Sequence, residues 1–144
     1  MDRAASGNWS NTNNWSGGDA PHVFESAPIE IDFPPGAART SVTNDINFGI
    51  FGALAVDSIV VTGNNYLIAG KGAGTNLVLT GNPAPFFSIN LQNLYCTGTN
   101  ITFDSSLNLI LENTNTITNN AGSTLFIQSL ITGAGEVVPS STPS

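Results

Sequence analysis

The sequence predicts an all-β protein: a short parallel β-helix, or solenoid, with an irregular tryptophan-containing cap at its N-terminus. Apolar residues fall into short runs of four to six, rich in Ile, Leu, Val, Phe and Thr, and closed by Gly, Asn or Pro. Several runs alternate apolar and polar side chains, as strands do. No stretch of a dozen residues combines helical spacing of apolar residues with good helix-forming residues.

The expected strands follow one another closely along the chain. In order they are IEIDF from Ile29, SIVVTG from Ser58, YLIAG from Tyr66, NLVLTG from Asn76, FFSINL from Phe86, NITFD from Asn100, LNLILEN from Leu107 and STLFIQS from Ser123. In LNLILEN, Leu107, Leu109 and Leu111 can share one face of a strand, which indicates a half-buried sheet.

A weak internal repeat and the placement of asparagine favour a solenoid. IVVTG from Ile59 and LVLTG from Leu77 are similar and lie 18 residues apart. A coil of roughly 18 to 25 residues is long enough for one solenoid turn whose apolar side chains stack on the next. Asn gathers in the segments 63–65, 112–116 and 118–122. These segments are expected to be corners, because Asn tolerates left-handed backbone angles.

The 144 residues are expected to form one domain. Residues 1–45 are polar and then rich in proline, which indicates an N-terminal cap and lead-in that would cover the first turn. Residues 46–138 are expected to form the β-solenoid, and residues 139–144 a disordered tail.

Charge excludes several classes of partner. The net charge of −7 comes from ten carboxylates against only Arg3, Arg39 and Lys71, so no basic patch exists to bind nucleic acid or an anionic membrane. No apolar run approaches the roughly 20 residues that span a bilayer. The N-terminus lacks the segments of a secretion signal, which fits either a removed signal or a protein assembled inside a cell. The only cysteine, Cys96, is expected to be a small buried apolar residue.

A family resemblance is carried by GNWSNTNNWSGGDAP, by the segment SVTNDINFGIFGALAVDSIVVTGNNYLIAG and by TLFIQSLITGAGEVV. The chain resembles bacterial autotransporter-associated β-strand repeat proteins from about Gly7 to Val138. The matching positions are Trp9, Asn14 with Trp15, Asp19, Thr43 to Asp45, and Gly133 to Gly135. This resemblance implies a passenger-type parallel β-helix that is exported and displayed outside the cell.

Few residues suggest a chemical site. Trp9 and Trp15 can stack on sugar rings, or they can plug the end of the solenoid, which is the favoured interpretation. Glu30 and Asp32 share one strand face and can in principle supply a carboxylate pair for glycoside hydrolysis. His22, the sole histidine, excludes a multi-histidine metal site and comes with no nucleophile motif. GKGAG at residues 70–74 lacks the spacing of a phosphate loop and indicates a tight turn.

The sequence therefore predicts no catalytic residue, metal or cofactor. We expect a non-enzymatic structural or adhesive module, extracellular or at the cell surface, that associates with itself as a trimer or an end-to-end stack. Surface glycans and a host particle are further candidate partners. One alternative is a decoration or fibre protein on a virion surface. The other is a carbohydrate-binding module or polysaccharide-acting enzyme.

Overall fold

A computed structural model of the chain shows a parallel β-solenoid of about four turns. The structure describes residues 7–22, 29–46, 53–80 and 93–140. The described helices are two single 3-10 turns, η1 (Thr12–Asn14) and η2 (Ser16–Gly18), and neither is long enough to cross a membrane. The expected all-β solenoid is thus confirmed.

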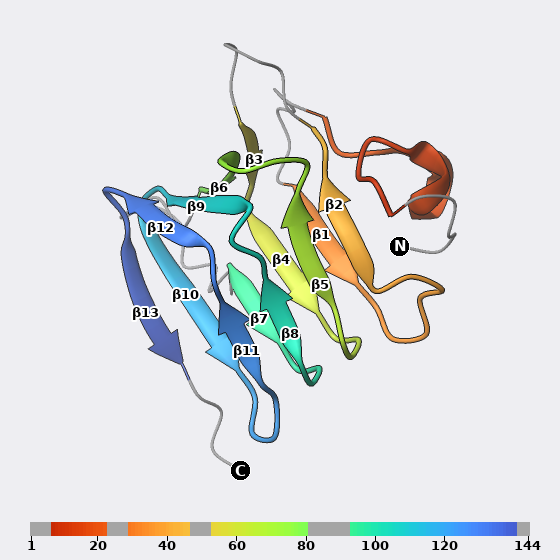
Figure 1. Cartoon of the computed structure of the whole chain (residues 1–144). Helices are drawn as coiled ribbons and strands as arrows, with labels where there is room; N and C mark the ends of the chain where they lie inside the picture. Colours follow the sequence, from red (N-terminus) through yellow and green to blue (C-terminus); the bar gives the residue numbers. More distant parts are fainter. Residues whose placement is uncertain (1–6, 23–28, 47–52, 81–92, 141–144) are drawn as a thin grey trace.

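Three parallel sheets form the walls of the solenoid (Figure 1). The first sheet contains β1 (Glu30–Phe33), β4 (Ser58–Val61), β7 (Leu94–Cys96), β10 (Thr114–Asn119) and β13 (Glu136–Ser140). The second contains β2 (Ser41–Asn44), β5 (Leu67–Gly70), β8 (Ile101–Phe103) and β11 (Leu125–Ile127). The third contains β3 (Leu54–Val56), β6 (Thr75–Leu79), β9 (Leu107–Leu111) and β12 (Leu130–Gly133). Consecutive strands occupy different walls, so each strand stacks on the strand that comes three places earlier in the chain.

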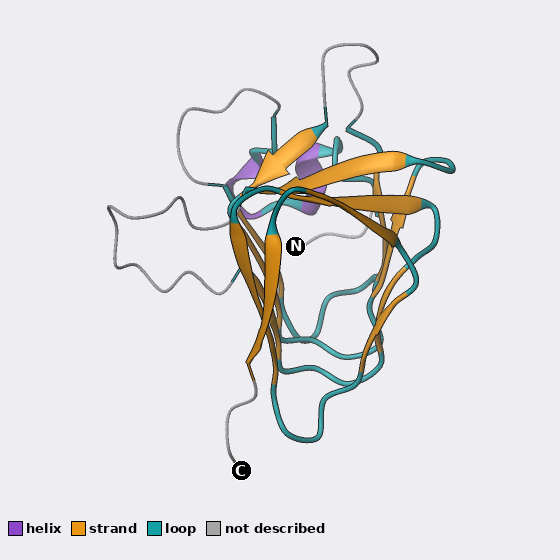
Figure 2. Ribbon diagram, turned by 90° about the vertical axis from the view of Figure 1, so that its left-hand side faces the viewer, coloured by secondary structure: helices purple, strands orange, loops and turns teal. Residues whose placement is uncertain are grey.

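Figure 2 shows the strands of the three walls arranged around the interior of the solenoid. The core is a set of side-chain columns that run along the inside of these walls. In the third sheet, register places Leu54, Leu77 and Leu109 in one column, and all three are buried. Equivalent columns in the other two sheets are Ile31–Ile59–Leu94 and Val42–Ile68–Phe103. Each fully buried side chain of this kind contributes roughly 1.5–3 kcal/mol, so stacked aliphatic and aromatic residues supply the main stabilisation.

The 18-residue repeat seen in the sequence does not mark a solenoid turn, and only some turns have the predicted length of 18 to 25 residues. Ile59 lies in β4 and Leu77 in β6, which are two walls of the same turn, so their 18-residue offset is not a coil. Residues that stack on each other are 22 positions apart between Leu109 and Ile131, and 35 apart between Ile59 and Leu94. Because each turn needs three strands and three corners, insertions at the corners lengthen individual turns and hide the period.

The solenoid is also longer than predicted at both ends. Its first turn begins with β1 at Glu30 and includes β2, although both strands fall in the expected lead-in of residues 1–45. At the other end β13 extends to Ser140, two residues into the expected tail, because it pairs with β10. The strand expected from Phe86 and the tail residues 141–144 lie outside the described residues.

Asparagine occupies left-handed corner positions in the expected segments 63–65 and 112–116, and also at Asn100, which lies outside the expected segments. The expectation of corners over 112–116 and 118–122 is partly wrong, because Thr114–Asn119 forms β10. Asn65, Asn100 and Asn113 have φ of 61°, 55° and 54°. Two of them stack on successive turns, where Asn100 Nδ2 donates to Asn65 Oδ1 at 3.1 Å. A second pair lies on the third sheet, where Asn108 Nδ2 donates to Asn76 Oδ1 at 3.2 Å. These amide pairs link neighbouring turns through their side chains.

Replacing Asn100 by alanine should lower the free energy of unfolding by about 1–2 kcal/mol, because a Cβ-bearing residue without a local hydrogen bond disfavours left-handed angles. Asn100→Gly relieves that backbone cost and should lose less than about 1 kcal/mol. Urea titration followed by circular dichroism measures both variants. Equal losses would contradict the backbone explanation.

Cys96 is buried in β7, which confirms the sequence-based prediction. Burial raises the pKa of its thiol to about 12. Because only the thiolate reacts, native Cys96 should be alkylated by iodoacetamide at pH 8 at least about a hundredfold more slowly than in the urea-unfolded chain. Mass spectrometry of timed samples measures both rates. Similar rates in the two states would contradict the buried position.

Candidate functional site at the N-terminal cap

The N-terminal segment adds a short strand to the first turn. The amide of Trp9 donates to the carbonyl oxygen of Thr43 at 2.9 Å. The amide of Thr43 donates to the carbonyl oxygen of Gly7, also at 2.9 Å. This parallel bridge covers the edge of β2 that does not face β5. The cap therefore protects a strand edge that would otherwise expose unpaired backbone groups.

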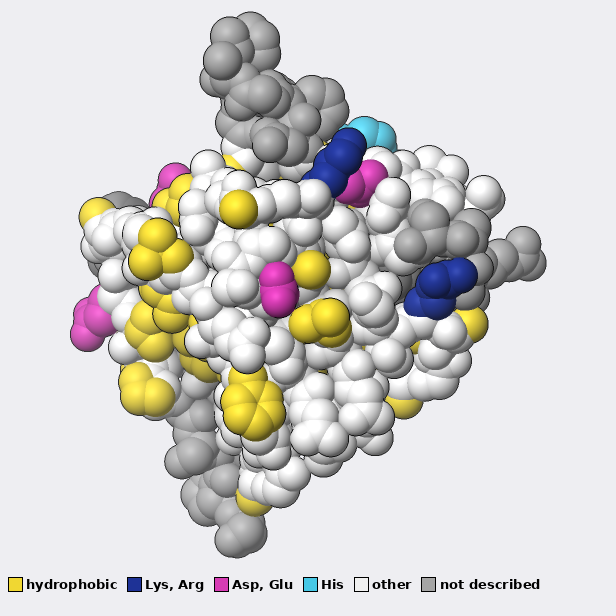
Figure 3. Space-filling model, viewed as in Figure 1, with side chains coloured by type: hydrophobic (Ala, Val, Ile, Leu, Met, Phe, Trp, Pro, Cys, Tyr) yellow, Lys and Arg dark blue, Asp and Glu magenta, His cyan; other side chains and the backbone are white. Residues whose placement is uncertain are grey.

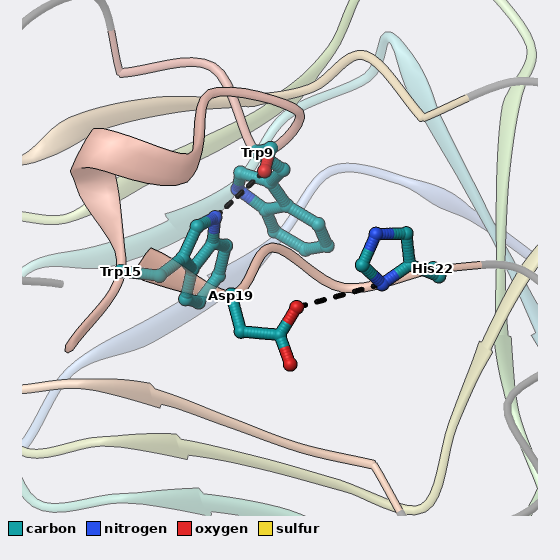
Figure 4. Close-up of polar contacts among 4 residues, drawn as sticks. All are labelled: Trp9, Trp15, Asp19 and His22. Carbon is teal, nitrogen blue, oxygen red and sulfur yellow. Dashed lines mark hydrogen bonds and ion pairs between the residues drawn. The ribbon is translucent and has the colours of Figure 1, made fainter. Parts of the chain in front are cut away.

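An aromatic cluster of Trp9, Trp15, Phe33 and Tyr66 lies beneath the cap, and Figure 4 shows its two tryptophans. Trp9 is fully buried, with its ring centroid 5.8 Å from Phe33 and 6.4 Å from Trp15 in an edge-to-face arrangement. The indole Nε1 of Trp15 donates to the carbonyl oxygen of Trp9 at 2.6 Å. Phe33 lies 5.3 Å from Tyr66 in the next turn, which continues the cluster into the core. Trp9 thus occupies the position of a plug.

Burial separates the two tryptophans as candidate sugar platforms. The ring of Trp9 has no exposed surface on which a sugar could stack. Trp15 is half-buried and packs against the core. Sugar binding stays a prediction, and of the two tryptophans only Trp15 keeps exposed surface for it.

A pocket of about 210 Å³ opens beside the cap. It is lined by Ser10, Thr12, Ala20, Pro21, His22, Asp45 and Ile46. Ser10 is held firmly to Asp45, since its amide donates to Oδ1 at 2.8 Å and its hydroxyl to Oδ2 at 2.6 Å. The pocket combines an apolar floor with a carboxylate and an imidazole at its wall.

The polar groups of this pocket are not arranged as a hydrolytic triad. The hydroxyl proton of Ser10 points to Asp45, whereas nucleophilic attack needs that proton directed to an imidazole. His22 Nδ1 instead lies 3.9 Å from Asp19 Oδ1, and both side chains are mostly exposed (Figure 4). The arrangement suits binding of a small polar molecule better than proton transfer.

The remaining sequence-derived candidates lie apart from the pocket. Glu30 and Asp32 occupy the two exposed positions of β1, on the outer face of the first sheet. The glycine-rich segment is a tight turn, as expected, in which Thr75 Oγ1 donates to the carbonyl oxygen of Gly72 at 2.8 Å. Among the residues that the structure describes, no group of three or more His, Cys, Asp or Glu side chains could hold a metal ion.

Three aspartates that sequence analysis left unassigned tie corners together. Asp57 accepts from the amide of Ile29 at 2.8 Å and from Thr80 Oγ1 at 2.9 Å. Hydrogen bonds from Ser106 hold the pKa of the Asp104 carboxyl below its usual value. Asp45, Asp57 and Asp104 each follow directly after a strand. This position at the end of a strand could have indicated their role, because a carboxylate there can accept hydrogen bonds from the backbone amides of the following turn.

The fold and the cap define a three-walled parallel β-solenoid with an aromatic plug at its N-terminal end. None of the protein-family models, curated proteins or solved structures compared with the chain matches it.

Proposed function

We propose that the protein is a non-enzymatic structural module. In this proposal a rigid β-solenoid at the cell surface or outside the cell presents its lateral faces to neighbours, adheres through them and associates with copies of itself. The location comes from the resemblance to autotransporter-associated repeats. The mechanical role comes from the way in which the polar residues of the chain are used.

The observation that carries the proposal is that carboxylates serve as structural ties. Asp45 fastens the cap, Asp57 joins Ile29 to Thr80, and Asp104 closes a corner. Each accepts hydrogen bonds from backbone or hydroxyl donors, an arrangement that stabilises a fixed shape. Because these few charged residues hold the shape of the solenoid, they support a scaffold role for the protein.

Self-association can be tested directly by light scattering over a range of protein concentrations, with electron microscopy of the same samples. The proposal predicts that the mean mass rises above the 14.9 kDa of one chain as concentration increases. A mass that stays at 14.9 kDa at the highest concentration would contradict this part of the proposal.

The cap pocket favours a second candidate function, carbohydrate binding. Its apolar lining of Ala20, Pro21 and Ile46 and the carboxylate of Asp45 are groups that bind hydroxylated rings, and Trp15 of the same cap is a further candidate for stacking. Glycan-array binding that is lost in Trp15→Ala and His22→Ala, but kept in Phe126→Ala on the distant β11, would support it. The absence of binding to any glycan would remove this candidate.

A virion decoration or fibre protein is the same module in another setting. The tests of mass and glycan binding apply to it unchanged. Neighbouring genes for capsid and tail proteins would favour the virion, and their absence would favour the cell surface.

A further inference from the structure

The C-terminal end of the solenoid consists of three terminal strands. β11, β12 and β13 are each the last strand of their sheet, so among the described strands each has a neighbour on one side only. The outward-directed backbone N–H and C=O groups of such strands can pair with another chain. This surface, formed by β11, β12 and β13, is called the open end below.

One apolar core column, that of the third sheet, reaches the surface at the open end, and further exposed aliphatic residues lie on β12 and β13. Ile131 is the fourth member of the column that contains Leu109, yet it is 44% exposed where Leu109 is 1% exposed. Val137, which stacks on buried Asn115, is 38% exposed. Leu130, at 60%, lies at the rim. Figure 3 shows hydrophobic side chains gathered at the side of the molecule where Figure 1 places β12 and β13.

The open end is almost free of charge. Between residues 113 and 140 the only charged side chain is Glu136. Four carboxylates, those of Asp19, Glu30, Asp32 and Asp45, belong to the cap or the first turn at the other end. A largely apolar patch with a single carboxylate, bordered by strand edges that have no described neighbour, is the kind of surface that forms a protein interface.

The N-terminal end is a poor partner for this surface. The segment Gly7–Trp9 already pairs with β2, and Trp9 fills the interior behind it. Head-to-tail stacking would also press carboxylates such as Asp19 toward an apolar face, which costs desolvation energy without a compensating cation. A second open end has matching apolar side chains and matching free edges.

We propose that the open end binds the open end of a second copy and forms a two-fold dimer. This inference rests on the proposed self-association and specifies its surface. A two-fold contact uses the same patch on both subunits and stops at two, unlike a head-to-tail stack. Pro139 has no N–H to donate, so β11 and β12 are the better edges for pairing in this dimer.

The first test compares Ile131→Lys with a matched control, Leu67→Lys, in sedimentation equilibrium. Leu67 is also an exposed aliphatic residue, but it lies on β5 in the second turn. We expect Ile131→Lys to weaken the dimer by about tenfold or more, and Leu67→Lys to leave it unchanged, since a buried unpaired charge disrupts an interface. Equal affinities for both variants and the parent chain would overturn the inference. Circular dichroism confirms that each variant is folded.

The second test does not depend on the folding of the lysine variant. Ala134→Cys places an exposed thiol in the turn between β12 and β13, and Ser16→Cys places one in the cap. Native Cys96 is buried and should not interfere. With a long bis-maleimide, the Ala134→Cys protein should form cross-linked pairs and the Ser16→Cys protein should not. Cross-links only in a mixture of the two variants would indicate head-to-tail contact and overturn the inference.

The two proposals fail in different ways. A parent chain that stays monomeric contradicts both self-association and the open-end dimer. A parent chain that self-associates, with unchanged affinity in Ile131→Lys and no cross-linked Ala134→Cys pairs, keeps the proposed function and overturns the open-end dimer.

Discussion

Replacing Trp9 by alanine should lower the free energy of unfolding by about 3–5 kcal/mol, the range for removing a buried large aromatic side chain. The ring is fully buried and contacts both Phe33 and Trp15, so the vacated space lies between the cap and the core. The backbone hydrogen bond from Trp9 to Thr43 of β2 does not need the side chain, so the expected loss comes from the vacated space in the core. Chemical denaturation followed by circular dichroism measures the change.

Trp9→Phe is the matched control for this prediction. The indole Nε1 of Trp9 is buried without a hydrogen-bond partner in the described part of the chain, so its removal carries no penalty. Phenylalanine should therefore recover most of the stability that alanine loses. A Trp9→Ala protein as stable as the parent chain would show that Trp9 does not plug the solenoid.

A methyl group at Gly98 should destabilise the protein by about 3 kcal/mol or more, at the upper end of the cost of overpacking. Corners of successive turns stack here, and the backbone of Gly98 lies directly against the backbone of Gly63. A Cβ at Gly98 would collide with the carbonyl oxygen of Gly63, and a Cβ at Gly63 would lie 2.5 Å from the carbonyl oxygen of Pro34. Since the obstacles are backbone atoms, relief requires the turns to separate.

Gly72→Ala is the control, because a Cβ at Gly72 meets nothing within 4 Å and the residue needs no left-handed conformation. Its thermal midpoint should stay close to that of the parent chain. The Gly98→Ala midpoint should fall by several degrees or more. Equal midpoints for the two variants would contradict the close stacking of these corners.

The strands and the core could be predicted because apolar and polar residues alternate within short segments of the sequence. The runs that contain Ile59, Leu77 and Leu109 show strand periodicity, and their inward-facing residues form the core columns. The plug position of Trp9 was predictable too, because a large aromatic residue in a polar segment suits the end of a solenoid. These features depend on local pattern, which one sequence contains.

The remaining features depend on pairing between distant segments. Thr114–Asn119 reads as corner sequence, yet it forms β10 because β7 and β13 pair with it on either side. The bond from Ser10 to Asp45 joins residues 35 positions apart, and no motif marks it. The pocket was missed for the same reason. Variable insertions at the corners concealed the true length of each turn.

The most direct test of the account is hydrogen exchange measured at low and at high protein concentration. Amides of β2, covered by Gly7–Trp9, should be protected at both concentrations, because that edge is paired within the chain. Outward amides of β11 and β12 should become protected only at high concentration, when open ends meet. Equal exchange of β11 and β12 at both concentrations, or rapid exchange throughout β2, would contradict an N-terminal plug opposite an associating end.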